Sequence, residues 1–220
     1  GLVRYSVFPA GILDNTVLFS VSAIVHQTSC IDLAQPAGIA LTLAEQFKHG
    51  CAYRCRRDQA GRGGSMSWAS PGSITVCEPA APAPGQPTII GANAQFGPGK
   101  SRKVNDYKPG PDADSRQCRL SWFTEALERV AQLPCPPKSI ALPHSIGCGL
   151  AGGHWPSYRT IIEEFAAAYP AIKVHVVQRT LDFQKHLFNT AGEASVKARA
   201  FVGAWTCPLQ RALGSAVVDC

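Results

Sequence analysis

The chain alternates between short apolar runs and longer segments in which apolar residues recur at helical spacing. Apolar or alternating runs predict strands over residues 2–8, 22–27, 73–77, 88–94, 139–143 and 172–177. Apolar positions every three or four residues predict helices over residues 38–47, 116–132 and 157–169. Because strands and helices alternate with short connections, the sequence predicts a three-layer α/β/α sandwich around a central sheet.

The composition of these segments and of their connections predicts how the segments are arranged. The alternation in 2–8 indicates an edge strand followed by a turn at 11–15, whereas 22–27 is apolar enough to be internal. The strands at 73–77 and 88–94 are predicted to pair as a hairpin with a long Ala- and Pro-rich tip. Residues 54–70, rich in Gly, Arg and Ser, are expected to form a solvent-exposed excursion.

The length of 220 residues favours one domain with a single substantial core. We expect this domain to span residues 1–180, and residues 181–220 to form a C-terminal helical extension packed on it. No apolar run approaches the length of a membrane helix, and the N-terminus carries no targeting pattern. We therefore expect a soluble protein with no membrane partner. The sequence leaves its compartment unknown, although an intracellular location is favoured.

The formal net charge of +6 suits a phosphorylated partner, but the Lys and Arg residues are scattered. The densest cluster, Arg54 to Arg57 with Arg62 nearby, is predicted to be a solvated face rather than a nucleic-acid groove. Nucleic acid is therefore not an expected partner. A small phosphorylated ligand would gain from the same positive field.

Nine cysteines are many for an intracellular chain, and their odd number excludes complete pairing within one chain. Cys51 and Cys55 lie near His49, but no second pair at zinc-ligand spacing follows, so no metal ion and no cofactor are expected. We predict a disulfide from Cys51 or Cys55 to another loop cysteine. Several of the cysteines are expected to be simply buried thiols.

A glycine-rich segment follows the strand at 139–143 and precedes the helix at 157–169. It contains Gly147, Gly149, Gly152 and Gly153, with only small or apolar residues and no acidic side chain among them. Glycine lets backbone N–H groups turn toward an anion, and the N-terminus of a helix adds partial positive charge. The segment therefore predicts a phosphate-binding loop, although such turns also serve only to reverse a chain after a strand.

Three loops leave the ends of predicted strands, at residues 28–38, 95–113 and 145–154. In α/β sheets of this kind, ligands bind at the carboxyl ends of the strands. We therefore expect these loops to converge. His175 lies on the opposite side of its strand from the apolar positions, which indicates a packed or surface histidine rather than a catalyst.

Four segments together resemble the macro domain family across residues 20–178. They are HQTSC with AGIALTLAEQF, NAQFGPGK, DSRQCRLSWF and PHSIGCGLAGGHW. The resemblance implies an α/β/α sandwich with a mixed central sheet that binds ADP-ribose. Some members of this family are readers of ADP-ribose, and others hydrolyse ADP-ribose esters or ADP-ribose 1″-phosphate.

The resemblance implies a diphosphate between two loops and a distal ribose at a third place. The first loop is Gly38, Ile39 and Ala40, and the second comprises Ser145, Ile146, Gly147, Cys148, Gly149, Leu150, Ala151 and Gly152. The distal ribose would face Ser29, Cys30, Gln95 and Phe96. Asp14 is the nearest candidate to receive the adenine amino group, although it follows the first strand later than the family pattern expects.

The chain departs from the family pattern where mechanism is concerned. Ser29 stands where relatives place an Asn, Ala151 where those that form a lysyl adduct place an Asp, and Ala37 where others place a carboxylate in the first loop. These departures disfavour the routes through a lysyl adduct or a carboxylate of the first loop. They leave water-mediated chemistry at the distal ribose, and this chemistry needs a general acid or base.

Three titratable residues are candidates for that role, namely His154, Asp32 and Asp106, each of which could equally be an exposed loop residue. A thiolate role for Cys148 is disfavoured because the loop lacks an arginine. We expect release of phosphate from ADP-ribose 1″-phosphate. The alternatives are a non-catalytic reader of ADP-ribosylated proteins and a hydrolase of ADP-ribosyl esters on acidic side chains.

Overall fold

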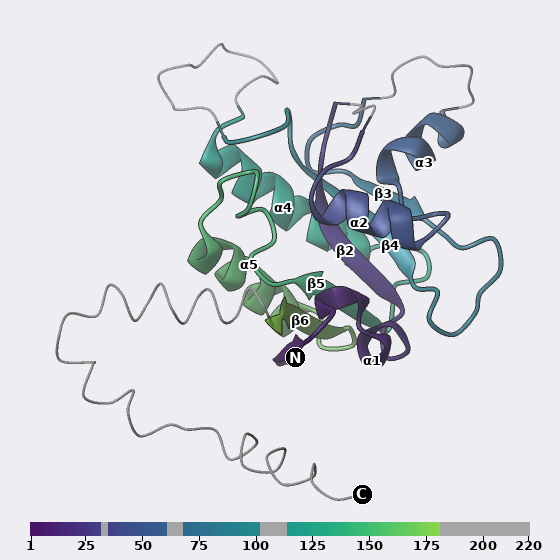
Figure 1. Ribbon diagram of the computed structural model, residues 1–220. Coiled ribbons are helices and arrows are strands. Elements are labelled where there is room, and N and C mark those ends of the chain that lie inside the picture. The colour runs from purple at the N-terminus through teal and green to yellow at the C-terminus, as the bar shows by residue number, and fades with distance from the viewer. Residues whose placement is uncertain (32–34, 61–67, 102–113, 181–220) are drawn as a thin grey trace, which may run out of the picture. The chain divides into compact units, whose positions relative to one another are not determined.

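The computed structural model describes residues 1–31, 35–60, 68–101 and 114–180 (Figure 1), and all of them belong to one compact unit, Gly1–Thr180. The predicted helical extension at 181–220 lies outside the described residues. Among the helices that are described, none is both long and apolar enough to cross a membrane.

The sheet is six-stranded, with the order β1-β6-β5-β2-β4-β3. Its strands are β1 (Val3–Phe8), β2 (Ala23–Ser29), β3 (Ile74–Cys77), β4 (Thr88–Gln95), β5 (Ser139–Pro143) and β6 (Lys173–Arg179). All neighbouring pairs are parallel except β3 with β4. The sheet is therefore mixed, β1 is an edge strand, and β3 and β4 pair as a hairpin, as the sequence predicts.

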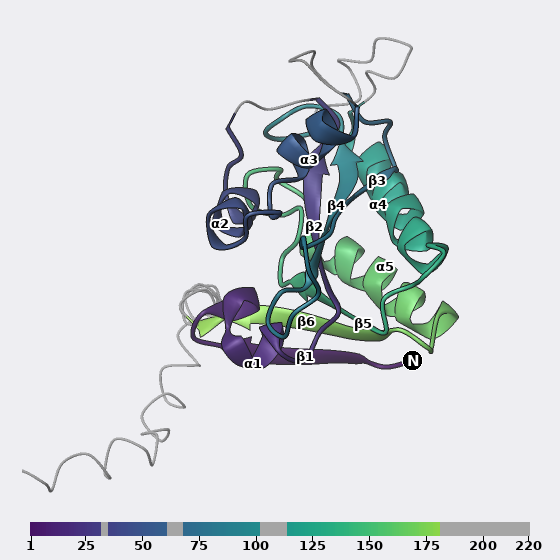
Figure 2. The same ribbon diagram turned by 90° about the vertical axis from the view of Figure 1, so that its right-hand side faces the viewer.

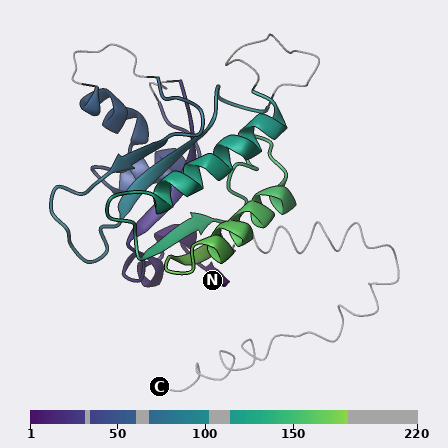
Figure 3. The ribbon, with the colours of Figure 1, turned by 180° about the vertical axis from the view of Figure 1, so that it is seen from behind.

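Helices cover both faces of the sheet (Figure 2). On one face lie α4 (Arg116–Ala131) and α5 (Trp155–Ala168), which run across the sheet in Figure 3. On the other lie η1 (Gly11–Leu13), α1 (Asn15–Leu18), α2 (Ile39–Gln46) and α3 (Ala52–Gln59). The predicted turn at 11–15 is thus two short helices, because the Asp14 carboxylate accepts a hydrogen bond from the Thr16 N–H and begins α1.

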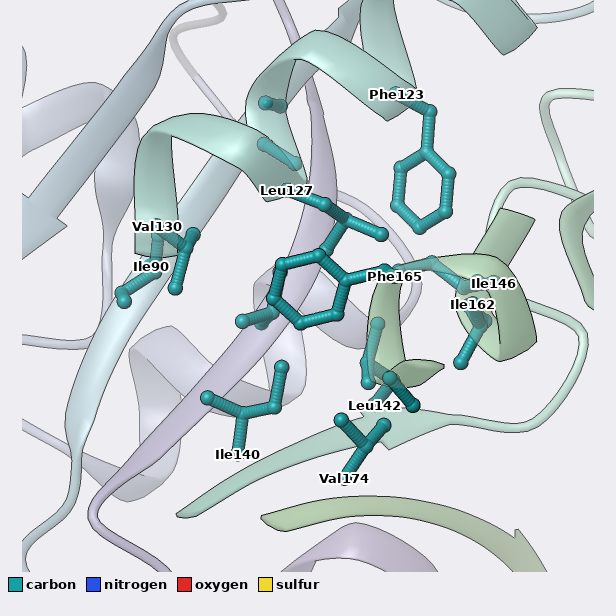
Figure 4. Packing of buried hydrophobic residues seen from close by; sticks show 14 of the residues in the cluster. Ile90, Phe123, Leu127, Val130, Ile140, Leu142, Ile146, Ile162, Phe165 and Val174 are labelled. Atoms are coloured by element: carbon teal, nitrogen blue, oxygen red, sulfur yellow. The ribbon is translucent and has the colours of Figure 1, made fainter. Parts of the chain in front are cut away.

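Each face of the sheet has its own hydrophobic core. Phe123, Leu127 and Val130 of α4 pack with Ile162 and Phe165 of α5 against one face, as Figure 4 shows. Leu43 and Phe47 pack against the other face. All seven residues of β2 are buried, and its neighbouring residues alternate between the two cores. Both faces of β2, up to its carboxyl end, are therefore packed against a hydrophobic core.

The prediction of an exposed excursion at 54–70 is wrong for its first part, because α3 occupies residues 52–59. Arg56 is buried, and its guanidinium donates hydrogen bonds to the carbonyl oxygens of Ser29 (3.0 Å) and Cys30 (3.3 Å). The arginine cluster is therefore not simply a solvated face. An arginine that binds backbone carbonyls in the interior cannot be told from a surface arginine by residue type alone.

The predicted disulfide is also wrong among the described residues, where Cys51 and Cys55 are free thiols like the other described cysteines. Cys55 Sγ instead donates to the Val76 carbonyl at 3.4 Å, and Cys55 packs against the core cluster that contains Cys77. These thiols pack α3 onto β3 without a covalent bond.

His26 gives the fold a pH dependence. Its side chain is fully buried on β2, neither ring nitrogen makes a hydrogen bond of normal geometry, and burial lowers the pKa of the imidazole to about 4. The unfolded chain takes up a proton at this histidine below pH of about 6.5, whereas the folded chain does so only near pH 4. Stability is therefore lost as the pH falls through this window.

We expect His26 to lower the free energy of unfolding by up to about 3 kcal/mol between pH 6.5 and pH 4. Urea unfolding of the wild type and of His26→Leu at both pH values measures this contribution. The variant should show a fall smaller by about that amount. Equal falls in the two proteins would contradict this account of His26.

Candidate anion-binding site at the carboxyl ends of the strands

The order of the strands places a ligand site beside the end of β2. The chain leaving β2 continues to α2 on one face of the sheet, whereas the chains leaving its neighbours β4 and β5 continue to α4 and α5 on the other face. Where adjacent parallel strands send their loops to opposite faces, the loops separate and leave room for a ligand. This topology identifies the site without reference to any motif.

The described parts of the three predicted loops converge there. A Cβ atom on Gly38 would lie 3.6 Å from Leu150 Cδ1, which joins the first loop to the glycine-rich loop. A Cβ atom on Gly152 would lie 2.9 Å from Lys100 Cγ, and Ser29 Oγ donates to the Phe96 carbonyl at 2.8 Å. The prediction of convergence is therefore confirmed for these segments.

The glycines of the loop serve different purposes. Gly147 has a positive φ of 71°, and a Cβ atom there would lie 2.5 Å from Gln27 Oε1 and 2.7 Å from the Tyr158 hydroxyl. Gly153 likewise has no room, since its Cβ would lie 2.6 Å from the Gly147 carbonyl oxygen. Around Gly149, by contrast, no atom lies within 4 Å of such a Cβ. Packing explains Gly147 and Gly153, whereas Gly149 borders open space.

Consecutive backbone N–H groups in this loop have no partner among the described residues. Inside the loop, the N–H groups of Cys148, Gly152 and Gly153 bond the carbonyls of Ser145, Gly149 and Gly147. Those of Gly149, Leu150 and Ala151 make no such bond. Adjacent N–H groups of this kind form a concave anion-binding surface.

The first loop offers a second set of donors at the start of α2. The first hydrogen bonds of this helix run from Leu41 and Thr42 to the Gly38 carbonyl. The N–H groups of Gly38, Ile39 and Ala40 therefore have no partner within the described part of the chain, as expected at a helix N-terminus. Because Gly38 adjoins Leu150, the two sets of donors are neighbours.

The residues predicted to face the distal ribose lie beside these loops, with Ser29 and Cys30 buried and Gln95 and Phe96 half-buried. Ser29 and Cys30 are both fully buried, and burial is the main reason that the pKa of the Cys30 thiol is raised to about 12. Gln27 Nε2 donates to Gln95 Oε1 at 2.9 Å, and Gln95 Nε2 donates to the Gly97 carbonyl at 3.1 Å. Hydrogen bonds within the protein therefore fix the side chains of Gln27 and Gln95. The contact of these residues with a ribose stays a prediction.

Of the predicted catalytic residues, only His154 lies among the described residues, because Asp32 and Asp106 fall outside them. His154 is exposed at the N-cap of α5, with Nδ1 3.0 Å from Ser157 Oγ. Cys148 packs against the core, and burial raises the pKa of its thiol to about 11, so it is a neutral thiol near pH 7.

Asp14 lies at the start of α1, where one carboxylate oxygen is occupied by the Thr16 N–H at 3.0 Å. Gly11, just before it, adjoins Arg179 at the end of β6, so this segment reaches the same edge of the sheet as the loops. The contact of Asp14 with an adenine remains a prediction.

Sequence reasoning missed several residues of the site. His144 follows β5 directly, with Nδ1 2.9 Å from Ser145 Oγ and its ring centroid 4.4 Å from that of Trp155. Asp114 and Arg119 form a buried ion pair that reaches two of the loops. For Asp114 and Arg119, the only signal in the sequence was their position at the start of a predicted helix, where an acidic residue is typical of an N-cap.

A hollow elsewhere on the molecule is not suited to the same chemistry. It lies at the amino ends of β2 and β4, between Phe19 and the proline-rich connection from β3 to β4, and Glu78 is the one titratable residue that lines it. Among the described residues, no cluster of three or more His, Cys, Asp or Glu side chains could hold a metal ion. The carboxyl ends of the strands are therefore the better candidate site.

The chain is similar in structure to solved macrodomains. The macrodomain of Mycobacterium tuberculosis DarG is 15% identical, with a TM-score of 0.54 over 81% of this chain and 98% of that one. The macrodomain of Thermus aquaticus DarG is 20% identical, with a TM-score of 0.53 over 80% and 97%. A protein of unknown function from Bacteroides thetaiotaomicron is 23% identical, with a TM-score of 0.55 over 80% and 97%.

No protein-family model and no curated protein matches the sequence. The structural similarity nevertheless spans nearly the whole length of each of these solved structures. The chain therefore has the macrodomain fold, an α/β/α sandwich with a mixed sheet, as its resemblance to that family implies.

Proposed function

We propose that this protein binds ADP-ribose, with the diphosphate between the start of α2 and the glycine-rich loop. The observation that carries the proposal is the pair of adjoining donor sets, at residues 38–40 and 149–151, whose N–H groups have no partner among the described residues. A diphosphate offers oxygen acceptors to both sets at once. Donors already oriented by the fold require little reorganisation on binding.

The electrostatics of the loops favour an anion. The described parts of the three loops carry no carboxylate, and Asp114, directly after the second loop, is paired with Arg119 at 2.5 Å. Lys100 lies against Gly152 at the rim, and the chain as a whole carries a net charge of +6. The diphosphate would therefore meet no unpaired negative charge in these segments.

We propose further that the protein is a hydrolase acting at the 1″ end of ADP-ribose, with ADP-ribose 1″-phosphate as substrate and phosphate as product. His154 is the proposed general acid or base, with Asp32 and Asp106 as the further candidates. His144 is an additional histidine beside the same loop, next to Ser145. Imidazole suits this role because its pKa lies near neutral pH.

The second candidate function is a non-catalytic reader of ADP-ribosylated proteins. It is favoured by Ala37 and Ala151, which stand where the resemblance places the acidic residues of hydrolytic relatives. Cleavage of ADP-ribosyl esters on acidic side chains is a third candidate. It shares the pocket and differs only in the leaving group.

Two glycine substitutions separate a role in binding from a role in folding. Gly149→Val places its side chain in open space beside the free N–H groups, so we expect stability within about 1 kcal/mol of the wild type and at least a tenfold loss of ADP-ribose affinity. Gly147→Ala, at positive φ and against Gln27, should lose about 2–3 kcal/mol of stability. Calorimetric titration and denaturant unfolding measure these effects. Unchanged affinity in a folded Gly149→Val protein would argue against the site.

Incubation with ADP-ribose 1″-phosphate and with a glutamate-linked ADP-ribosylated protein distinguishes the three functions. We expect release of phosphate from the first substrate, reduced about 100-fold or more in His154→Ala, as for loss of a general acid or base. Binding of ADP-ribose without any release would identify a reader. Release of ADP-ribose from the protein alone would identify the ester hydrolase. Full phosphate release by His154→Ala would exclude His154.

A further inference from the structure

Asp114 and Arg119 form a buried ion pair at the start of α4. Their side chains are 6% and 3% exposed, and the guanidinium bonds both carboxylate oxygens, from Nε at 2.6 Å and from Nη2 at 2.5 Å. Such a two-point pair fixes the orientation of both side chains. The apolar residues Phe123, Leu127 and Val130 are the part of α4 that packs in the hydrophobic core, and the ion pair lies outside that cluster.

The remaining hydrogen bonds of the pair go to the two loops at the site. Arg119 Nη1 donates to the carbonyl oxygens of Gly99 (2.8 Å) and Ala151 (3.1 Å). The Asp114 carboxylate accepts from the N–H groups of Phe96 (3.2 Å) and Gly97 (3.1 Å). The pair therefore joins the start of α4, the loop after β4 and the glycine-rich loop.

The bond to Ala151 is the one that bears on the unpartnered N–H groups of residues 149–151, which we call the anion cradle. Ala151 is the last of the consecutive residues with an unpartnered N–H, and Gly152 after it has a positive φ of 65°. The Ala151 carbonyl belongs to the peptide between Ala151 and Gly152, and the N–H of that peptide bonds the Gly149 carbonyl at 3.1 Å. Because the peptide unit is rigid, Arg119 fixes the plane of the peptide that directly follows the three unpartnered N–H groups. Since Asp114 neutralises Arg119, the pair contributes orientation rather than free positive charge.

We propose that Asp114 and Arg119 are positioning residues that set the geometry of the ADP-ribose site, an inference that rests on the function proposed above. Both residues act through the backbone of residues 96–99 and 151 and are not catalytic. Lysine cannot replace Arg119, because one ammonium group cannot bond a carboxylate at two points and also reach two carbonyls. The geometry of the guanidinium, and not its charge, is therefore the property required.

The test measures ADP-ribose affinity by calorimetry in Arg119→Lys and Asp114→Asn, at a temperature where each protein is folded. Each variant should bind at least tenfold more weakly than the wild type. Leu127→Ala is the control, since Leu127 is buried on the same helix outside the pair. It should lower the melting temperature at least as much as Arg119→Lys while leaving the affinity within twofold.

A measurement on the wild type keeps the inference falsifiable if both variants fail to fold. The Arg119 Nε–H resonance, held by Asp114, should shift when the protein is saturated with ADP-ribose, and an unmoved resonance would overturn the inference. Wild-type affinity in folded Arg119→Lys would do the same. If the wild type shows no heat with ADP-ribose, the proposed function fails, and the inference fails with it.

Discussion

Unpartnered backbone N–H groups at two adjoining turns are the feature on which the account of this protein depends. Backbone N–H groups at a turn or at a helix N-terminus that have no acceptor in the protein can bind water or an anion. Here they occur at residues 38–40 and 149–151, and Gly38 lies against Leu150. Because Gly38, Gly149 and Leu150 are exposed, a diphosphate would replace water at donors that the fold already orients, and this is the physical reason to expect an anion there.

The scaffold that holds these turns is built around β2, which is buried along its whole length between the two helical layers. Two buried arginines support its surroundings from opposite faces. Arg56 of α3 binds the carbonyls at the end of β2, and Arg119 of α4 binds the carbonyls of residues 99 and 151. Arg56 is bound to backbone oxygens and Asn93, and Arg119 to backbone oxygens and Asp114, so both guanidinium groups hold the scaffold while the backbone N–H groups face a ligand.

Much of the fold could be predicted from the sequence because its strands and helices have clear periodicity. The strand at 139–143 and the helix that follows the glycines are present as predicted, and so is the convergence of the loops. The helix at 52–59 was missed because its buried face contains Tyr53 and Arg56, which give no apolar periodicity. The expected disulfide failed for a related reason, since residue type does not show whether a thiol pairs or packs.

The glycines of the candidate site could be predicted from the sequence. The contacts between residues that are far apart in the sequence could not. Gly147 is specified locally by its positive φ, but the tight fit against Gln27 joins residues far apart in the sequence. Asp114 and Arg119 are close in sequence, yet their role depends on the Ala151 carbonyl. Only the tertiary structure shows that these residues belong to one arrangement.

The most direct test of the central claim follows the backbone amides of the ¹⁵N-labelled protein by NMR during titration with ADP-ribose. The account predicts that the largest changes in amide shift occur at residues 38–40 and 149–151, in the slow- or intermediate-exchange regime of a specific complex. Changes centred on the hollow beside residues 78–87, or no changes at all, would contradict it.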